Sequence, residues 1–285
     1  IPNGTTPANL AHILVGSEGT LAFFKKIELA LSPLPSNTIL GVCHFHSFHD
    51  AMTATKSIVS LGPTAVELID RTMIDLARRI EIFRHVISEV IKTDSESILL
   101  VEFAEGDEAT NLRKLNSLVE MMGDLGHGES TVIVGDPAQQ KAIWEVRKQA
   151  LNIVMSMKGD GKPISFVEDC AVELDDLPEY TSRLNEIFLR HGTKGTWYAH
   201  ASVGTLHVRP VLNLKLDEDV RKMRAIAEET FAMVRQYKGS HSGEHGDGIV
   251  RSEFHKPMFG SQIVDAFAEV KKLFDPSNIL NPGRI

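Results

Sequence analysis

The chain has 285 residues, of which 42% are hydrophobic and 24% charged, which is ordinary for a globular protein of one large or two modest domains. A formal net charge of -8 and the lack of a basic stripe exclude a nonspecific nucleic-acid binder. The two cysteines, Cys43 and Cys170, exclude a disulfide framework and argue against a cysteine-built metal site. We find no apolar run of roughly 20 residues and no signal peptide. We therefore expect a cytoplasmic protein with peripheral membrane contact at most.

Strands and helices are predicted to alternate along the chain. Residues 12–32 read as strand, tight turn at 16–19 and strand, and Pro33 and Pro35 predict a linker. Further strands are predicted at 38–45, 64–70, 97–104, 130–135, 164–172 and 196–201, and helices at 47–62, 71–93, 108–124, 136–157, 175–191, 217–237 and 260–273. This order favours an α+β fold of ferredoxin-like units, with a mixed or antiparallel sheet and helices on one face.

Two histidines stand out near the C-terminal third, in WYAHASVGTLHVRP. His200 and His207 are seven positions apart, so a continuous strand would place them on opposite faces. Gly204 predicts a turn between two strands, which would bring both imidazoles to one point.

The loop GSHSGEHGDG (239–248) follows, with four glycines in ten residues. Such loops occur where backbone passes close to a ligand. Glu244 and His245 lie in it, and two imidazoles with a carboxylate make a typical open metal site. From the residues alone, a metal or catalytic site and a group of ordinary hydrogen-bonded histidines remain equally open.

Two arginines and one turn are candidates for binding. Arg147 in WEVRK could pair a substrate carboxylate or make a surface salt bridge, and Arg209 is a second candidate for the carboxylate. The turn at residues 16–20, GSEGT, could hold a phosphate or a cofactor edge through exposed amides.

Five motifs together carry a family resemblance: LVGSEGTL (14–21), FVEDCAV (166–172), YAH…LHVRP (198–210), SGEHGDGIVRS (242–252) and FDPSNILNPGRI (274–285). With them the chain resembles the C-terminal part of FAD-linked oxidases of the vanillyl-alcohol-oxidase type. Within these it is similar to the D-lactate dehydrogenase, glycolate oxidase and D-2-hydroxyglutarate dehydrogenase group, and most to large members fused to an iron–sulfur domain.

The resemblance implies a domain division. Residues 1–32 would be the C-terminal tail of a truncated FAD-binding domain, 33–275 the substrate or cap domain, and 276–285 a segment returning to the flavin. FAD would be bound mostly outside this chain, so we expect a fragment that is inactive as an isolated chain. The residues implied to contact the cofactor are Gly16, Ser17, Glu18, Gly19, Thr20 and Asn281.

The resemblance also assigns roles at the site. His200, His207 and Glu244 would bind a divalent metal (zinc, manganese or iron), His245 would be the base, and Arg147 would hold the substrate carboxylate. Arg209 stands where D-2-hydroxyglutarate dehydrogenases have an asparagine, and the family's HxGDGNLH reads HASVGTLH here. These departures leave the substrate open.

The implied function is FAD-dependent oxidation of a D-2-hydroxy acid, of the D-lactate, glycolate or D-2-hydroxyglutarate type, to the 2-oxo acid. The metal would assist hydroxyl deprotonation, and hydride would pass to the flavin. The expected partners are the substrate and an electron acceptor or iron–sulfur domain. A non-catalytic subunit or docking module of a flavin redox complex is the alternative, and a metallohydrolase is a third reading.

Overall fold

The computed structural model describes residues 9–35, 37–92 and 94–285, and they form two compact units. Unit 1 comprises the described residues 9–32 and 242–285, and unit 2 comprises the described residues between 33 and 241. This division groups residues 242–275 with unit 1. The assignment of residues 1–32, 33–275 and 276–285 to an FAD-domain tail, a substrate domain and a returning segment stays a prediction. Residues 1–8, the start of the predicted FAD-domain tail, lie outside the described residues.

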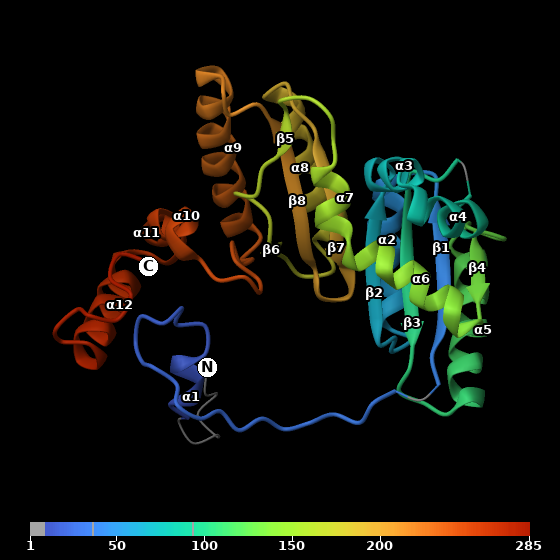
Figure 1. The fold of residues 1–285 in the computed structure, drawn as a ribbon, viewed down its shortest axis with the longest axis horizontal. Coiled ribbons are helices and arrows are strands. Elements are labelled where there is room, and N and C mark those ends of the chain that lie inside the picture. Colours follow the sequence, from blue (N-terminus) through green and yellow to red (C-terminus); the bar gives the residue numbers. More distant parts are fainter. Residues whose placement is uncertain (1–8, 36, 93) are drawn as a thin grey trace. The chain divides into compact units, whose positions relative to one another are not determined.

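Unit 2 is built on a sheet with strand order β4-β1-β3-β2-β7-β8-β5, and β6 also pairs with β8 (Figure 1). Every pairing is antiparallel. The strands are β1 (Ile39–Phe45), β2 (Ala65–Asp70), β3 (Ser97–Phe103), β4 (Thr131–Val134), β5 (Lys162–Pro163), β6 (Cys170–Ala171), β7 (Gly195–His200) and β8 (Thr205–Leu212).

The helices of unit 2 begin at side-chain caps in several places: Ser47, Asp70, Asp107 and Asp136 each accept a hydrogen bond from a backbone N–H in the first turn. The helices of unit 2 are α2 (Phe48–Val59), α3 (Arg71–Arg79), α4 (Glu81–Val90), α5 (Glu108–Asp124), α6 (Pro137–Lys148), α7 (Ala150–Met155), α8 (Leu177–Arg190), η1 (Ala201–Val203) and α9 (Asp217–Gln236). Unit 1 contains α1 (Ala11–Leu14), α10 (Gly248–Arg251), η2 (Ser252–Phe254), α11 (His255–Phe259) and α12 (Ser261–Phe274).

The sheet consists of two ferredoxin-like halves. In the first half, β1-α2-β2-β3-α5-β4 gives the order β4-β1-β3-β2. In the second half, β6-α8-β7-β8-α9 ends at Ser240, which pairs with Ala171 of β6, so the same order recurs. The halves join where β2 pairs with β7, with Glu67 opposite His200. The predicted α+β fold of ferredoxin-like units with an antiparallel sheet is confirmed.

Helices cover both faces of the first half, whereas the sequence predicted one covered face. Helices α2, α5, α8 and α9 form one layer, and Leu118 of α5 packs directly over Gly41. The opposite face, here called the α6 face, packs Leu40 and Val42 against α3, α4, α6 and α7. The continuous apolar run of β1 already fits a strand buried on both sides.

Several predicted elements differ in the structure. Residues 12–32 contain helix α1 and no strand, since a strand needs backbone partners and the described part of unit 1 offers none. The predicted helix 71–93 breaks at Ile80, where the backbone is extended, and the helix 136–157 breaks at Gln149. Of the predicted strand 164–172 only β6 (Cys170–Ala171) forms, and β5 (Lys162–Pro163) lies just before the predicted range.

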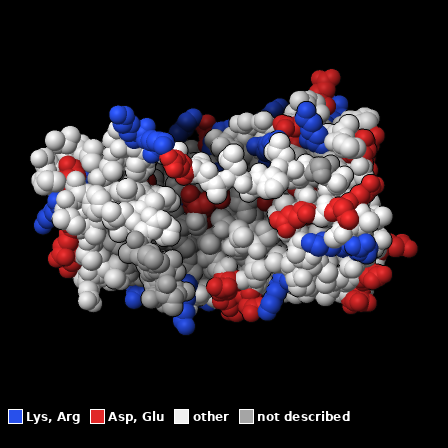
Figure 2. Space-filling view, turned by 90° about the horizontal axis from the view of Figure 1, so that it is seen from below, with Lys and Arg blue, Asp and Glu red and all other residues white. Residues whose placement is uncertain are grey.

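The surface offers charges of both signs. On the face drawn in Figure 2, Lys and Arg side chains lie among Asp and Glu side chains and are not gathered by sign. Among the described residues, none of the helices combines the length and the hydropathy that crossing a membrane requires.

Candidate active site

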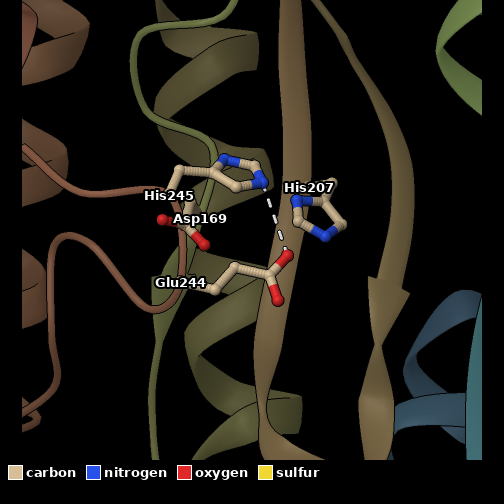
Figure 3. Close-up of side chains that lie close together, drawn as sticks. All are labelled: Asp169, His207, Glu244 and His245. Atoms are coloured by element: carbon tan, nitrogen blue, oxygen red, sulfur yellow. Dashed lines mark ion pairs between the residues drawn. The ribbon is translucent and has the colours of Figure 1, made fainter. Parts of the chain in front are cut away.

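The two histidines of the sequence motif lie side by side on unit 2. His200 ends β7 and His207 lies on β8, and the turn between them runs through η1 and Gly204, as predicted. Gly204 adopts the left-handed conformation with φ 67°. Because the turn folds β8 back beside β7, His200 and His207 lie on the same face of the sheet, the α6 face. Their ring centroids are 5.0 Å apart, and their ring planes meet at 87°. Figure 3 shows His207 projecting from its strand.

Glu67 of β2 connects this pair to an arginine. Its Oε1 lies 2.8 Å from Nδ1 of His200, and its Oε2 lies 2.6 Å from Nη2 of Arg147. The residue is buried. Glu67 was not among the site residues predicted from the sequence, although an acid inside the apolar strand AVELID is unusual unless it is paired. That pattern is the signal that could have found it.

Arg147 of α6 and Arg209 of β8 both pack on Tyr198. Their guanidinium carbons lie 4.9 and 5.3 Å from the ring centroid, distances typical of cation–π contacts. Arg209 also donates to the phenol oxygen at 2.5 Å. Burial raises the pKa of Tyr198, so the phenol remains protonated at neutral pH. Tyr198 thus contacts both arginines that are predicted to bind the substrate carboxylate.

The FVEDCAV motif supplies a counter-ion for Arg209. Glu168 forms an ion pair with Nη2 of Arg209, and Ser165 Oγ donates to the other carboxylate oxygen at 2.6 Å. Asp169 has φ 71° and donates its N–H to the Leu206 oxygen at 2.6 Å. This bend is why the predicted strand is interrupted, and it presents Glu168 to β8.

The arginine cluster keeps hydrogen-bonding capacity. Nε of Arg147 and Nε of Arg209 are buried and have no hydrogen-bond partner among the described residues. Buried donors in native proteins are normally satisfied, by water or ligand if not by protein. Two such guanidinium groups, each already paired with one glutamate, suit the binding of a further carboxylate.

The Gly-rich loop of unit 1 carries the other predicted site residues. Glu244 Oε1 lies 3.4 Å from Nε2 of His245, the pair marked by the dashed line in Figure 3. Both side chains are partly exposed. Gly246 and Gly248 have positive φ values of 85° and 49°, so the loop conformation depends on glycine there.

Glu18 holds three of the family motifs together within unit 1. Its carboxylate accepts hydrogen bonds from the Gly248 N–H at 2.9 Å and from Arg284 Nε at 3.2 Å. Asn281 donates from Nδ2 to the Glu18 carbonyl oxygen at 2.7 Å. The turn at 16–20, the loop at 239–248 and the C-terminal NPGR are therefore joined through one residue.

The other residues predicted to contact the cofactor lie in the same turn. Gly16 and Gly19 have positive φ, and Thr20 Oγ1 donates to the Ser17 oxygen at 2.6 Å. Ser17 is 8% exposed, and its Oγ has no hydrogen-bond partner among the described residues. A side chain at Gly16 would meet nothing within 4 Å, so a ligand can approach the backbone there.

Comparison with curated proteins gives relatives that are longer than this chain. The chain is 33% identical over 289 residues to D-2-hydroxyglutarate dehydrogenase of Escherichia coli (strain K12), covering 98% of this chain and 28% of that protein. It is 26% identical over 280 residues to the mitochondrial D-lactate dehydrogenase [cytochrome] of Arabidopsis thaliana, covering 97% and 47%. The chain thus spans half or less of the length of either relative.

Solved structures share the fold at low identity. P-cresol methylhydroxylase with substrate bound aligns with a TM-score of 0.64 at 12% identity, covering 88% of this chain and 53% of that chain. Alkyldihydroxyacetonephosphate synthase aligns with a TM-score of 0.64 at 14% identity, covering 96% and 49%. The family model for the FAD linked oxidases, C-terminal domain, matches residues 34–285. The chain therefore belongs to the FAD-linked oxidases, as the C-terminal domain of that family.

Proposed function

We propose that the full-length protein oxidises a D-2-hydroxy acid to the 2-oxo acid with FAD as the oxidant. The relatives are D-2-hydroxyglutarate and D-lactate dehydrogenases by name. The observation that carries the proposal is the buried polar cluster on the α6 face, where two imidazoles stand beside two guanidinium groups. That combination suits a substrate with a hydroxyl group next to a carboxylate.

A divalent metal fits the donor set on unit 2. The Glu67 carboxylate accepts from Nδ1 of His200, which selects the tautomer whose Nε2 can bind a metal. Such carboxylate–histidine pairs commonly orient metal-binding imidazoles. The centroids of the two rings are 5.0 Å apart.

Chain connectivity supplies the argument for the third ligand. Ser240 and Ala171 exchange two backbone hydrogen bonds of 2.9 Å, which ties the start of the Gly-rich loop to β6. Glu244 follows four residues further on in this loop. We propose His200, His207 and Glu244 as ligands of zinc, manganese or iron(II).

FAD fits the turn at residues 16–20 of unit 1. Ser17 offers a buried hydroxyl that no described residue bonds, and the backbone at Gly16 is open to a ligand. The Glu18 carboxylate accepts a hydrogen bond from Arg284, and the Asn281 amide donates one to the Glu18 carbonyl oxygen. Both side chains therefore stabilise the turn. We propose that Ser17 and the backbone of Gly16, Gly19 and Thr20 contact the flavin.

The residues of this chain divide the reaction between them. Arg147 and Arg209 hold the substrate carboxylate through their remaining N–H groups and fix the reacting carbon. His245 accepts the proton of the substrate hydroxyl. When bound, FAD supplies a two-electron oxidant and the divalent metal supplies a Lewis acid.

The test is a screen of D-2-hydroxy acids with the full-length flavoprotein and a dye as electron acceptor. We expect dye reduction with at least one of D-lactate, glycolate and D-2-hydroxyglutarate, and His245→Asn should lower kcat by about 100- to 10,000-fold. His49→Asn, at an exposed position of α2, is the matched control and should keep wild-type kcat. A flavin-loaded protein that reduces the dye with none of these acids would favour a docking subunit instead.

A further inference from the structure

We propose that Glu67 is a positioning residue that holds His200 and Arg147 in a fixed relation, so that one carboxylate sets both the metal ligand and the substrate clamp. The proposal rests on the proposed function, because it takes the metal and carboxylate roles from it. It adds a residue of β2, from the first half of the sheet, to a site whose motif residues lie elsewhere.

The geometry gives each carboxylate oxygen its own partner. Oε1 faces Nδ1 of His200 at 2.8 Å, and Oε2 faces Nη2 of Arg147 at 2.6 Å. The side chains of Glu67 and Arg147 are each 10% exposed, so water has little access to their ion pair. A buried carboxylate between an imidazole N–H and a guanidinium makes charge-assisted hydrogen bonds, which are short and directional.

The three residues come from three elements, and Glu67 contacts both of the others. Backbone pairing places Glu67 opposite His200 across β2 and β7, so that distance is set by the sheet register. Arg147 comes from α6, which packs over the same face. Rotation of the Glu67 side chain would therefore release both partners at once.

Each contact has a defined chemical effect. Accepting the Nδ1–H selects the His200 tautomer whose Nε2 can bind a metal, and the negative charge makes that nitrogen a better donor. Pairing Nη2 of Arg147 fixes the plane of the guanidinium, which directs its other N–H groups. A substrate carboxylate then meets donors in one orientation.

Glu102 provides a matched control. It lies on β3, and its Oε2 accepts from Trp144 Nε1 of α6 at 2.9 Å. It thus also bridges the sheet and α6 but contacts an indole where Glu67 contacts an arginine. Glu102→Gln removes the same charge in the same layer without touching His200 or Arg147.

The experiment compares full-length wild type, Glu67→Gln and Glu102→Gln. Metal-free protein is titrated with Co²⁺, followed by its visible absorption, and kcat and KM are measured at saturating Co²⁺. For Glu67→Gln we expect the Co²⁺ dissociation constant to rise about 10- to 100-fold. We also expect KM for the 2-hydroxy acid to rise about tenfold, because Arg147 loses its charged partner. Glu102→Gln should match wild type in both.

The outcomes separate the two proposals. Wild-type Co²⁺ affinity or wild-type KM in Glu67→Gln overturns the bridging role, and so does an equal change in Glu102→Gln. A wild-type protein that oxidises no hydroxy acid rejects the proposed function, while the Co²⁺ titration still tests the hold on His200. If thermal unfolding shows that Glu67→Gln does not fold, Glu67→Asp replaces it. Its carboxylate is one methylene too short for both partners, and wild-type values of both constants would overturn the proposal.

Discussion

At the level of single residues, Gly204 determines how His200 and His207 meet. It stands in the left-handed region with φ 67°, where residues with a Cβ are strained. A Cβ built on it would lie 2.0 Å from the carbonyl oxygen of Val172. Both conformation and space therefore require glycine between the two strands.

Gly204→Ala should therefore be far more destabilising than alanine at another left-handed glycine. Gly192 is the matched control, because it also has φ 67° but its added Cβ would meet nothing within 4 Å. We expect Gly192→Ala to lower the free energy of unfolding by about 1 kcal/mol and Gly204→Ala by about 3 kcal/mol or more. Urea denaturation of both variants measures this. Equal losses would show that the Val172 contact relaxes without cost.

The sequence allowed some site residues to be predicted and not others. His200, His207 and the Gly204 turn lie within eight residues, so local spacing was enough to predict that the rings meet. Glu67 lies 133 residues before His200, and only the pairing of β2 with β7 joins them. Local patterns do not report such a pairing, which depends on tertiary structure.

At the level of elements, Asp70 connects the two halves of the sheet. Its Oδ1 accepts from the Met73 N–H at 2.8 Å, which caps α3, and its Oδ2 accepts from the Trp197 N–H of β7 at 3.0 Å. Burial raises its pKa to about 7 from 3.8, against the lowering effect of these two hydrogen bonds. The folded protein therefore holds this proton more tightly than the unfolded chain.

Asp70→Asn should change how stability depends on pH. The raised pKa means that the contribution of Asp70 is fully present below 3.8 and is lost as pH rises through about 7. Wild type should therefore lose stability relative to Asp70→Asn between about pH 4 and about pH 7, because asparagine does not titrate. Denaturation midpoints across this range measure the difference.

Asp107→Asn is the control for this titration. Asp107 caps α5 in the same way, by accepting from the Thr110 N–H at 2.7 Å, but its pKa is lowered, mainly by its hydrogen bonds to Thr110. Its contribution is present above its unfolded pKa and lost only as pH falls below that range. A stability difference between wild type and Asp70→Asn that stays constant from about pH 4 to about pH 7 would contradict the raised pKa.

Element boundaries were predictable where their signals are local. The helix predicted at 108–124 is α5 (Glu108–Asp124), because Asp107 caps it. The predicted strand 164–172 is interrupted because the backbone bends at Asp169, whose N–H donates a hydrogen bond to the carbonyl oxygen of Leu206 in β8. Caps are encoded within one turn, whereas this bend depends on a partner strand.

At the level of the whole molecule, the residues proposed to bind the metal are different from those proposed to contact the flavin. The described turn at 16–20 and the histidines on β7 and β8 lie in different units. Family membership was predictable from motifs spread along the chain, and the ferredoxin-like fold from the order of its predicted strands and helices. The joining of the two halves through β2 and β7 was not, because nothing in either strand's local sequence names the other as its partner.

Chelation should therefore separate activity from flavin content. We expect dialysis of the full-length protein against EDTA to remove turnover while the visible flavin absorbance remains, and added Zn²⁺ or Mn²⁺ to restore turnover. Elemental analysis before and after dialysis is the accompanying measurement. Full turnover in protein shown to be metal-free would exclude the metal from the reaction.

The pairing of β2 with β7 also imposes an order on biogenesis. During translation Glu67 leaves the ribosome 133 residues ahead of His200, so β2 presents an open edge until β7 is synthesised. An ion bound to His200, whose Nδ1 pairs with Glu67 of the first half, would favour the joined halves by mass action. Metal supply would then govern the yield of folded protein in the cell as well as its turnover.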